Sequence, residues 1–164
     1  ENALKRLTIV LVLLIAAAGA RADDAVYPAD ALLGVWETAR DGEGWSLVEI
    51  YERDDKVHGR ITWISDDVYG PDDEHGMAGQ PVVDRHNPDE SLRSRPLVGI
   101  DLMRDFEHDG RNKWKDGRIY DPQSGKDYRC KLTLKDPDTL EIFGYVKVGF
   151  VKLGRNTTWT RRAP

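Results

Sequence analysis

The chain has 164 residues, a formal net charge of −5 and a single cysteine, Cys130. This length favours one domain, and one cysteine excludes an internal disulfide, so an apolar core must stabilise the fold. The acidic balance argues against binding to nucleic acid or to anionic membrane surfaces, because both carry negative charge.

The first 22 residues have the layout of a secretory signal peptide. Lys5 and Arg6 form a positively charged start, a mainly apolar stretch follows over 7–18, and Ala20-Arg21-Ala22 supplies small residues around a cleavage site. An apolar helix of this length is too short to span the ~30 Å core of a bilayer. We therefore predict export, cleavage near Ala22 and a periplasmic product.

The rest of the chain has the pattern of short β-strands. Segments rich in β-branched and aromatic residues are separated by turn residues and cover 45–52, 57–65, 117–121, 126–134, 139–146 and 156–162. In the clearest of them Tyr128, Cys130, Leu132 and Leu134 alternate with polar residues, which indicates an antiparallel sheet with one buried face. Cys130 is thus expected to be a buried apolar residue rather than a nucleophile.

A series of such strands closes into a barrel or folds into a sandwich. We predict an all-β fold of about eight to nine antiparallel strands, and the resemblance of the chain ends given below implies that they form a barrel. The predicted organisation is a signal peptide over 1–22, a lead-in over 23–32 and a single β-barrel domain over 33–162.

A long segment rich in Gly, Pro and Asp, residues 65–96, interrupts the strands; we call it the acidic loop. Within it Asn87 suits the N-cap of a short helix, Pro88 its first position and Pro96 its end. His75 and His86 lie among carboxylates, but their order does not match a calcium-binding loop. A solvated acidic loop is therefore favoured over a cation site, and we predict no metal and no cofactor.

The stretch 121–125, Asp-Pro-Gln-Ser-Gly, is followed by Lys126. The resulting Gly-Lys pair is also found at the end of a phosphate-binding loop. Such a loop requires glycine where this chain has Tyr120, and Ser or Thr where it has Asp127. The stretch instead predicts a hairpin turn, with Asp121 capping the loop amides and Gly125 at positive φ.

Motifs over most of the chain resemble a known family. They are Asn87-Pro88-Asp89, Arg95-Pro96-Leu97, Gly99, Gly117, Tyr120-Asp121-Pro122, Gly125, Tyr128, Gly144-Tyr145, Leu153-Gly154-Arg155 and Trp159-x-Arg161. From Leu33 to Arg161 the chain resembles domain of unknown function 2147, a family of small exported bacterial proteins. The acidic insert over 69–79 departs from the family pattern. The family has no established activity. The resemblance therefore implies the fold and export from the cytoplasm, but not a function.

A second resemblance concerns the two ends of the strand series. Gly34-Val35-Trp36 in the first strand and Trp159-Thr160-Arg161 in the last are similar to the motifs of lipocalins and other calycins. The resemblance implies that Arg161 packs across Trp36 and closes one end of the barrel, a cation–π contact worth ~0.5–2 kcal/mol.

The aromatic residues in or beside the strands are the candidate ligand-binding residues: Trp45, Trp63, Tyr120, Tyr128 and Tyr145. An eight-stranded barrel holds either packed side chains or one small ligand, so these residues suit both.

The first hypothesis is a periplasmic binding module for a small apolar or amphipathic ligand. The alternative is an envelope structural or interaction protein with a filled core. A hydrolase acting on an envelope component is a distant third, because no serine has a nucleophile-elbow context and no carboxylate pair stands out.

Overall fold

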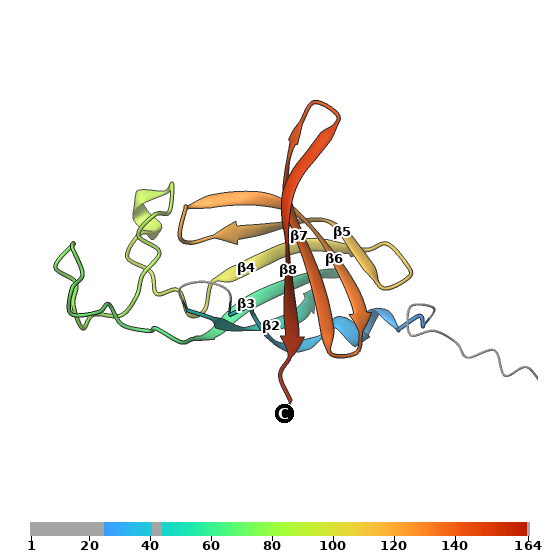
Figure 1. Ribbon diagram of the computed structural model, residues 1–164, viewed down its shortest axis with the longest axis horizontal. Helices are drawn as coiled ribbons and strands as arrows, with labels where there is room; N and C mark the ends of the chain where they lie inside the picture. The colour runs from blue at the N-terminus through green and yellow to red at the C-terminus, as the bar shows by residue number, and fades with distance from the viewer. Residues whose placement is uncertain (1–24, 41–43, 164) are drawn as a thin grey trace, which may run out of the picture.

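The computed structural model describes residues 25–40 and 44–163 (Figure 1). In this part of the chain, eight antiparallel strands form a closed barrel in chain order. They are β1 (Gly34–Glu37), β2 (Ser46–Arg53), β3 (Lys56–Ile64), β4 (Asp101–His108), β5 (Lys113–Asp121), β6 (Lys126–Asp136), β7 (Thr139–Val148) and β8 (Val151–Arg161). The pairing of β8 with β1, where Arg161 lies opposite Trp36, closes the barrel. The predicted all-β barrel is confirmed.

Alternating side chains place the core inside the barrel. On β6 the buried residues Cys130 and Leu132 lie opposite Gly144 and Ile142 of β7, as the period-two pattern predicts. Three large aromatic side chains, Trp36, Phe106 and Trp114, are fully buried. They fill the interior so tightly that a Cβ added to Gly117 would overlap the Phe106 ring.

The helical content is two short 3-10 turns within the described residues, η2 (Ala29–Leu32) and η3 (Glu90–Leu92). The expected short helix in the acidic loop is therefore present, but its cap is not the predicted Asn87. The N-cap is Asp89, whose side chain accepts a hydrogen bond from the Ser91 amide, while Asn87 Oδ1 accepts one from the Asp89 amide. Asn87 therefore caps a turn just before the helix, and its Nδ2 group donates to Asp84. No described helix has the length and apolar character needed to cross a membrane.

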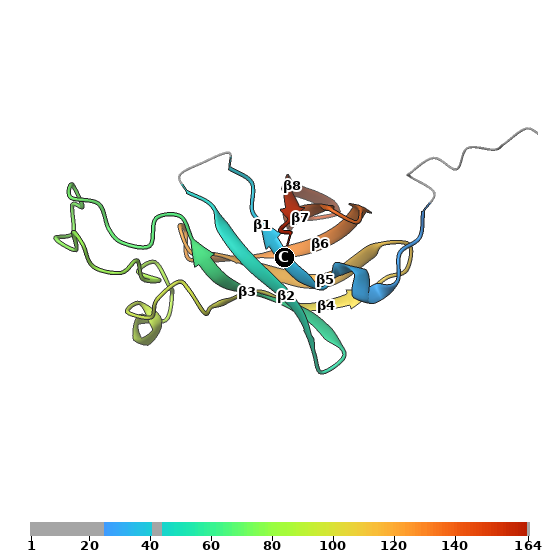
Figure 2. The same ribbon diagram turned by 90° about the horizontal axis from the view of Figure 1, so that it is seen from below.

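The chain connections divide between two ends of the barrel. η2 lies at the closed end, where Leu32 joins the core and its carbonyl oxygen accepts a hydrogen bond from Trp36 Nε1 at 2.9 Å. The connections after β1, β3, β5 and β7 belong to the other end, which we call the open end, because alternate connections of an antiparallel barrel share an end. The acidic loop extends away from the barrel there (Figure 2).

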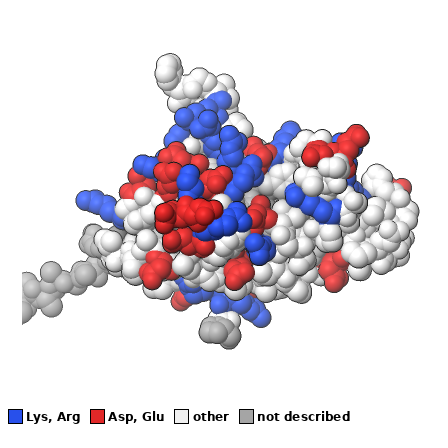
Figure 3. Space-filling view, turned by 180° about the vertical axis from the view of Figure 1, so that it is seen from behind, with Lys and Arg blue, Asp and Glu red and all other residues white. Residues whose placement is uncertain are grey.

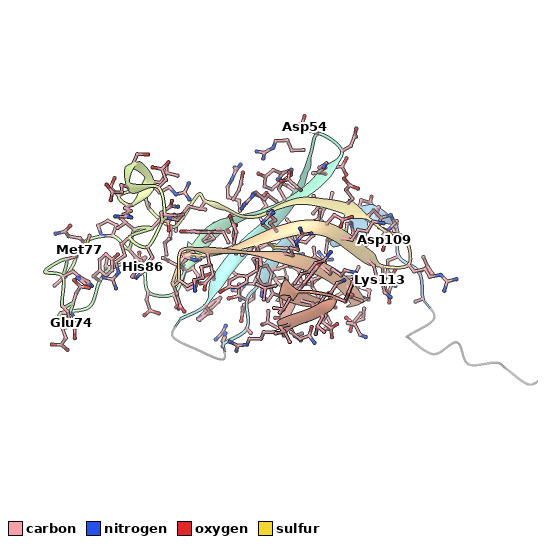
Figure 4. All side chains as sticks on the ribbon, turned by 90° about the horizontal axis from the view of Figure 1, so that it is seen from above. Asp54, Glu74, Met77, His86, Asp109 and Lys113 are labelled. Atoms are coloured by element: carbon pink, nitrogen blue, oxygen red, sulfur yellow. The ribbon has the colours of Figure 1, made fainter. Side chains whose placement is uncertain are left out.

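Figure 4 shows the separation of the two ends. Glu74 and Met77 mark the far tip of the acidic loop, and Asp109 and Lys113 mark the β4–β5 hairpin at the opposite side of the barrel. The acidic loop therefore stands beside the open end only.

Candidate ligand cleft at the open end

A cleft of about 900 Å³ lies at the open end, between the barrel and the acidic loop. We call it the open-end cleft. Its walls come from five places: the segment that leads into β2, the second half of β3, the acidic loop with Leu97 just after it, the start of β4, and the turn after β5. The lining residues are Thr38, Gly44, Trp45, Ser46, Ile61, Ile64, Ser65, Asp66, Val68, Tyr69, Gly70, Val82, Val83, Arg85, His86, Leu97, Leu102, Asp121, Pro122 and Gln123.

The floor of the cleft is apolar. Ile61, Ile64 and Leu102 are buried members of the barrel core, and Val82 and Leu97 pack against that core from the loop side. These residues belong both to the top of the core and to the bottom of the cleft. Ile61, Ile64 and Leu102 are already buried, so a ligand resting there would mainly cover apolar surface that the partly buried Val82 and Leu97 leave open.

One wall of the cleft is polar and held by the loop's own contacts. The Arg85 guanidinium lies 5.0 Å from the Tyr69 ring centroid and 3.3 Å from Asp73 Oδ1. Asp73 also accepts hydrogen bonds from the Met77 and His75 amides. The hydrogen bond from the Met77 amide is the largest cause that lowers the pKa of Asp73. Desolvation opposes it, and His75 and Arg85 lower the pKa further. An ionised Asp73 therefore organises the loop tip and fixes Arg85 at the cleft.

Trp45 forms part of the facing wall. Its ring centroid lies 4.6 Å from that of Trp63 and 4.0 Å from the Arg40 guanidinium carbon. Its backbone is held by Ser65, whose amide donates to the Trp45 carbonyl and whose Oγ accepts from the Trp45 amide. The ring thus has a fixed position at the rim of the cleft.

A buried polar cluster holds the acidic loop onto the barrel. Asp84 is 0 % exposed, and its carboxylate accepts hydrogen bonds from Tyr120 (2.6 Å), Asn87 (2.7 Å) and two nitrogens of Arg95 (2.8 and 3.1 Å). We call these four residues the Asp84 cluster. Burial, followed by the hydrogen bond to Asp84, raises the pKa of Tyr120 to about 12, so this hydroxyl stays a donor at neutral pH. The cluster fixes the loop position and thereby the shape of the cleft.

The 121–125 stretch is a turn, as predicted. Asp121 accepts hydrogen bonds from the Gln123 amide and the Ser124 hydroxyl, and the Gly125 amide donates to the Asp121 carbonyl. Gly125 has φ of +69°, and a Cβ at this position would overlap the carbonyl oxygen of His86. The glycine is therefore required both by the turn and by close contact with the acidic loop.

At the closed end, the Arg161 guanidinium carbon lies 4.2 Å from the Trp36 ring centroid. Its nitrogens donate to the carbonyl oxygens of Leu33 (2.9 Å), Pro137 (2.6 Å) and Ala31. This arginine joins β8 to the lead-in and to the β6–β7 connection, opposite the open-end cleft.

The residues that match a family model are the same as those that form the barrel, from the start of β1 to the end of β8. Residues 34–161 match the model of a family described as an uncharacterized protein conserved in bacteria, DUF2147. The chain belongs to the DUF2147 family. Among solved structures it is similar to protein HP1028 from Helicobacter pylori, described as belonging to the lipocalin family, with a TM-score of 0.65 and 25 % identity over 80 % of this chain and 83 % of that one. A search of curated proteins found no match. Both resemblances expected from the sequence are confirmed.

The candidate aromatic residues of this DUF2147 chain lie in different places. Trp45 lines the open-end cleft, and Trp63, 42 % exposed, packs against it. Tyr120 lies in the Asp84 cluster, beside a second hollow of about 580 Å³ between the acidic loop and strands β4 to β6. Tyr128 is half-buried on the same face of β6 as the core residues, and Tyr145 stacks on a neighbouring ring on the outer face of β7. Ligand contact stays a prediction for all five residues, and of them only Trp45 lines the open-end cleft.

Several cleft residues were not among the candidates, chiefly Tyr69, Arg85 and the floor isoleucines. Tyr69 and Arg85 lie in a segment without strand pattern, and an isoleucine in an alternating strand signals core only. Their shared location depends on how the acidic loop folds back. Within residues 25–40 and 44–163, no cluster of His, Cys, Asp or Glu side chains is arranged to hold a metal ion.

Proposed function

We propose that this protein binds a small amphipathic molecule in the open-end cleft. The observation that carries the proposal is the cleft itself, whose volume of about 900 Å³ falls within the ~300–1,000 Å³ typical of small-molecule sites. The lipocalin-like barrel supports it, because this architecture presents a mouth in which one small ligand is held.

The proposed ligand has an apolar body and a polar or anionic group. The body would lie on the floor formed by Ile61, Ile64 and Leu102, with the Trp45 and Tyr69 rings at the sides. The polar group would lie toward Arg85 and His86 on the loop wall. Because Arg85 is already oriented by Asp73, its guanidinium needs little ordering on binding.

The filled barrel limits how deep the ligand lies. Trp36, Phe106 and Trp114 occupy the interior between the floor of the cleft and the closed end. A ligand would therefore sit at the mouth rather than in the barrel centre. This packing also favours the alternative hypothesis, an envelope interaction protein with a filled core, so the binding experiment must separate the two.

The binding experiment uses the full chain and two probes, laurate and anilinonaphthalene sulfonate. We expect fluorescence titration to show saturable binding that Trp45→Ala and Arg85→Ala each weaken about tenfold, the usual cost of one lost packing or charge contact. Arg93→Ala is the matched control, because Arg93 lies in the same loop, outside the cleft lining, and bonds to Glu90 and the Asn87 carbonyl. Equal affinity of all variants, or no saturable binding, would favour the interaction protein.

We also propose that the protein acts after export, since residues 1–22 have the layout of a signal peptide. These residues lie outside the described part of the structure. Intact mass and N-terminal sequencing of protein from the host periplasm should show a chain starting near Asp23. Recovery of a periplasmic chain that retains residues 1–22 would contradict cleavage.

A further inference from the structure

The β7–β8 hairpin extends beyond the barrel. Figure 1 shows it rising alone above the other strands. Near its tip Val146 pairs with Leu153 and Val148 pairs with Val151, and Gly149-Phe150 forms the turn. Phe150 has a relative exposure of 109 %, and all four paired apolar residues are exposed. An exposed contiguous apolar patch of this kind marks an interaction surface.

The four paired apolar side chains all belong to one face of the hairpin. Counting by twos along β7, Val146 and Val148 share the face of Ile142, which is buried in the barrel. Leu153 and Val151, as their partners, share it on β8. The hairpin therefore carries the inner apolar face of the barrel out into solvent, where these four side chains are 44–59 % exposed.

The opposite face of the hairpin is positively charged. Lys147 pairs directly with Lys152, and Lys131 of β6 lies near Lys152. The nearby Lys131 first, then desolvation and the charge of Lys147, lower the pKa of Lys152, while Asp116 acts in the opposite direction. Figure 3 shows Lys and Arg side chains gathered below an uncharged tip at the top of the molecule. Positive charge thus accumulates next to the apolar tip.

We propose that the β7–β8 hairpin docks the protein on an anionic lipid surface, with Phe150 and the flanking valines in the apolar boundary and Lys147 and Lys152 on the headgroups. Apolar side chains beside lysines are the composition that binds membrane interfaces. Two or three strand residues at ~3.3 Å each match the ~5–10 Å depth of the headgroup boundary. The tip ends in a two-residue turn, a narrow protrusion that a fluid lipid surface accepts without a preformed groove.

The local charge of the hairpin is opposite to the charge of the chain as a whole. The net charge of −5 predicts repulsion from anionic surfaces on average. Much of the acidic excess, however, lies in the acidic loop, which extends in a different direction from the hairpin although both belong to the open end (Figure 1). Exposed charges farther than about 10 Å from the contact are largely screened at physiological salt, so the lysines dominate at the hairpin.

The test is sedimentation of the full chain with vesicles of phosphatidylcholine alone or mixed with phosphatidylglycerol. We expect binding to the mixed vesicles that falls as salt rises. Phe150→Asp, and the double variant Lys147→Glu with Lys152→Glu, should each lower the partition coefficient about tenfold or more. Lys135→Glu is the matched charge control, because Lys135 is exposed on β6 at the closed end, and Val98→Asp is the apolar control on another surface.

A second measurement places the hairpin at the lipid directly. Cys130 is buried, so an environment-sensitive dye on Phe150→Cys labels one position. Its emission should shift to the blue with anionic vesicles, and the same dye on Lys135→Cys should not respond. Equal binding to neutral and anionic vesicles, or binding unchanged by the hairpin variants, would overturn the proposal. A dimer that Phe150→Asp dissociates, without vesicle binding by the native chain, would also overturn it and assign this face to contact between copies.

Discussion

Arg161→Ala should lower the free energy of unfolding by about 2–4 kcal/mol. The guanidinium lies over the Trp36 ring at 4.2 Å, a contact worth ~0.5–2 kcal/mol. It also donates to the carbonyl oxygens of Ala31, Leu33 and Pro137, and hydrogen bonds from charged donors contribute ~1.5–3 kcal/mol each.

These contributions do not add in full. The Arg161 side chain is 24 % exposed, so water can reach some of the carbonyl oxygens once the side chain is removed. The three bonds and the ring contact also share one side chain, and coupled contacts are not additive. The expected loss is therefore well below their sum.

The assay is a urea melt followed by tryptophan fluorescence. Arg161→Lys should recover only part of the loss, because an ammonium group has no planar face and cannot reach three separate carbonyl groups at once. Arg162→Ala is the matched control; Arg162 is exposed and pairs with Glu37 at 3.4 Å, so its loss should stay within ~0.5 kcal/mol. Equal losses at the two arginines would refute the closing role of Arg161.

Three further predictions follow from the loop contacts and the core. Gly125→Val should lower the free energy of unfolding in a urea melt by ~3 kcal/mol or more, because its Cβ would overlap the acidic loop and valine resists a φ of +69°. Ser124→Ala, one residue earlier, should change stability by ~0.5 kcal/mol or less. Equal effects of the two substitutions would contradict this reasoning. Tyr120→Phe should cost ~1–3 kcal/mol by removing a donor from the buried Asp84 carboxylate, and a neutral effect would show that the remaining donors suffice. Burial raises the pKa of Cys130 to about 12, so Ellman's reagent should react with it only after unfolding, and rapid reaction with the folded protein would show that the thiol is accessible.

Local sequence patterns predicted much of the fold. The alternation around Cys130 and Leu132 identified β6 and its buried face, because the side-chain period of a strand is a local property. The Asp121 and Gly125 positions identified the turn for the same kind of reason, since each acts through its own backbone. β4 lacked such a clear pattern: Asp105 within it has φ of +64°, which interrupts the regular strand.

The candidate site was less predictable. Trp45 was named, but Arg85 and Tyr69 were not, because the cleft exists only where the acidic loop folds back onto the barrel. That folding depends on contacts between residues far apart in the chain, such as Tyr120 with Asp84. Tyr120 and Trp45 look alike as aromatic residues near strand ends, yet only the fold assigns one to a buried polar cluster and the other to the rim of the cleft.

The β7–β8 hairpin also shows that burial cannot be predicted from local sequence alone. Alternation predicts that Ile142 and Val148 share one face of a strand, and both do. It does not predict that Ile142 is buried while Val148 is exposed. Burial depends on whether neighbouring strands cover that face, and β6 pairs with β7 only from Thr139 to Tyr145. Periodicity determines direction within a strand, whereas strand length and register in the closed barrel determine what each side chain meets.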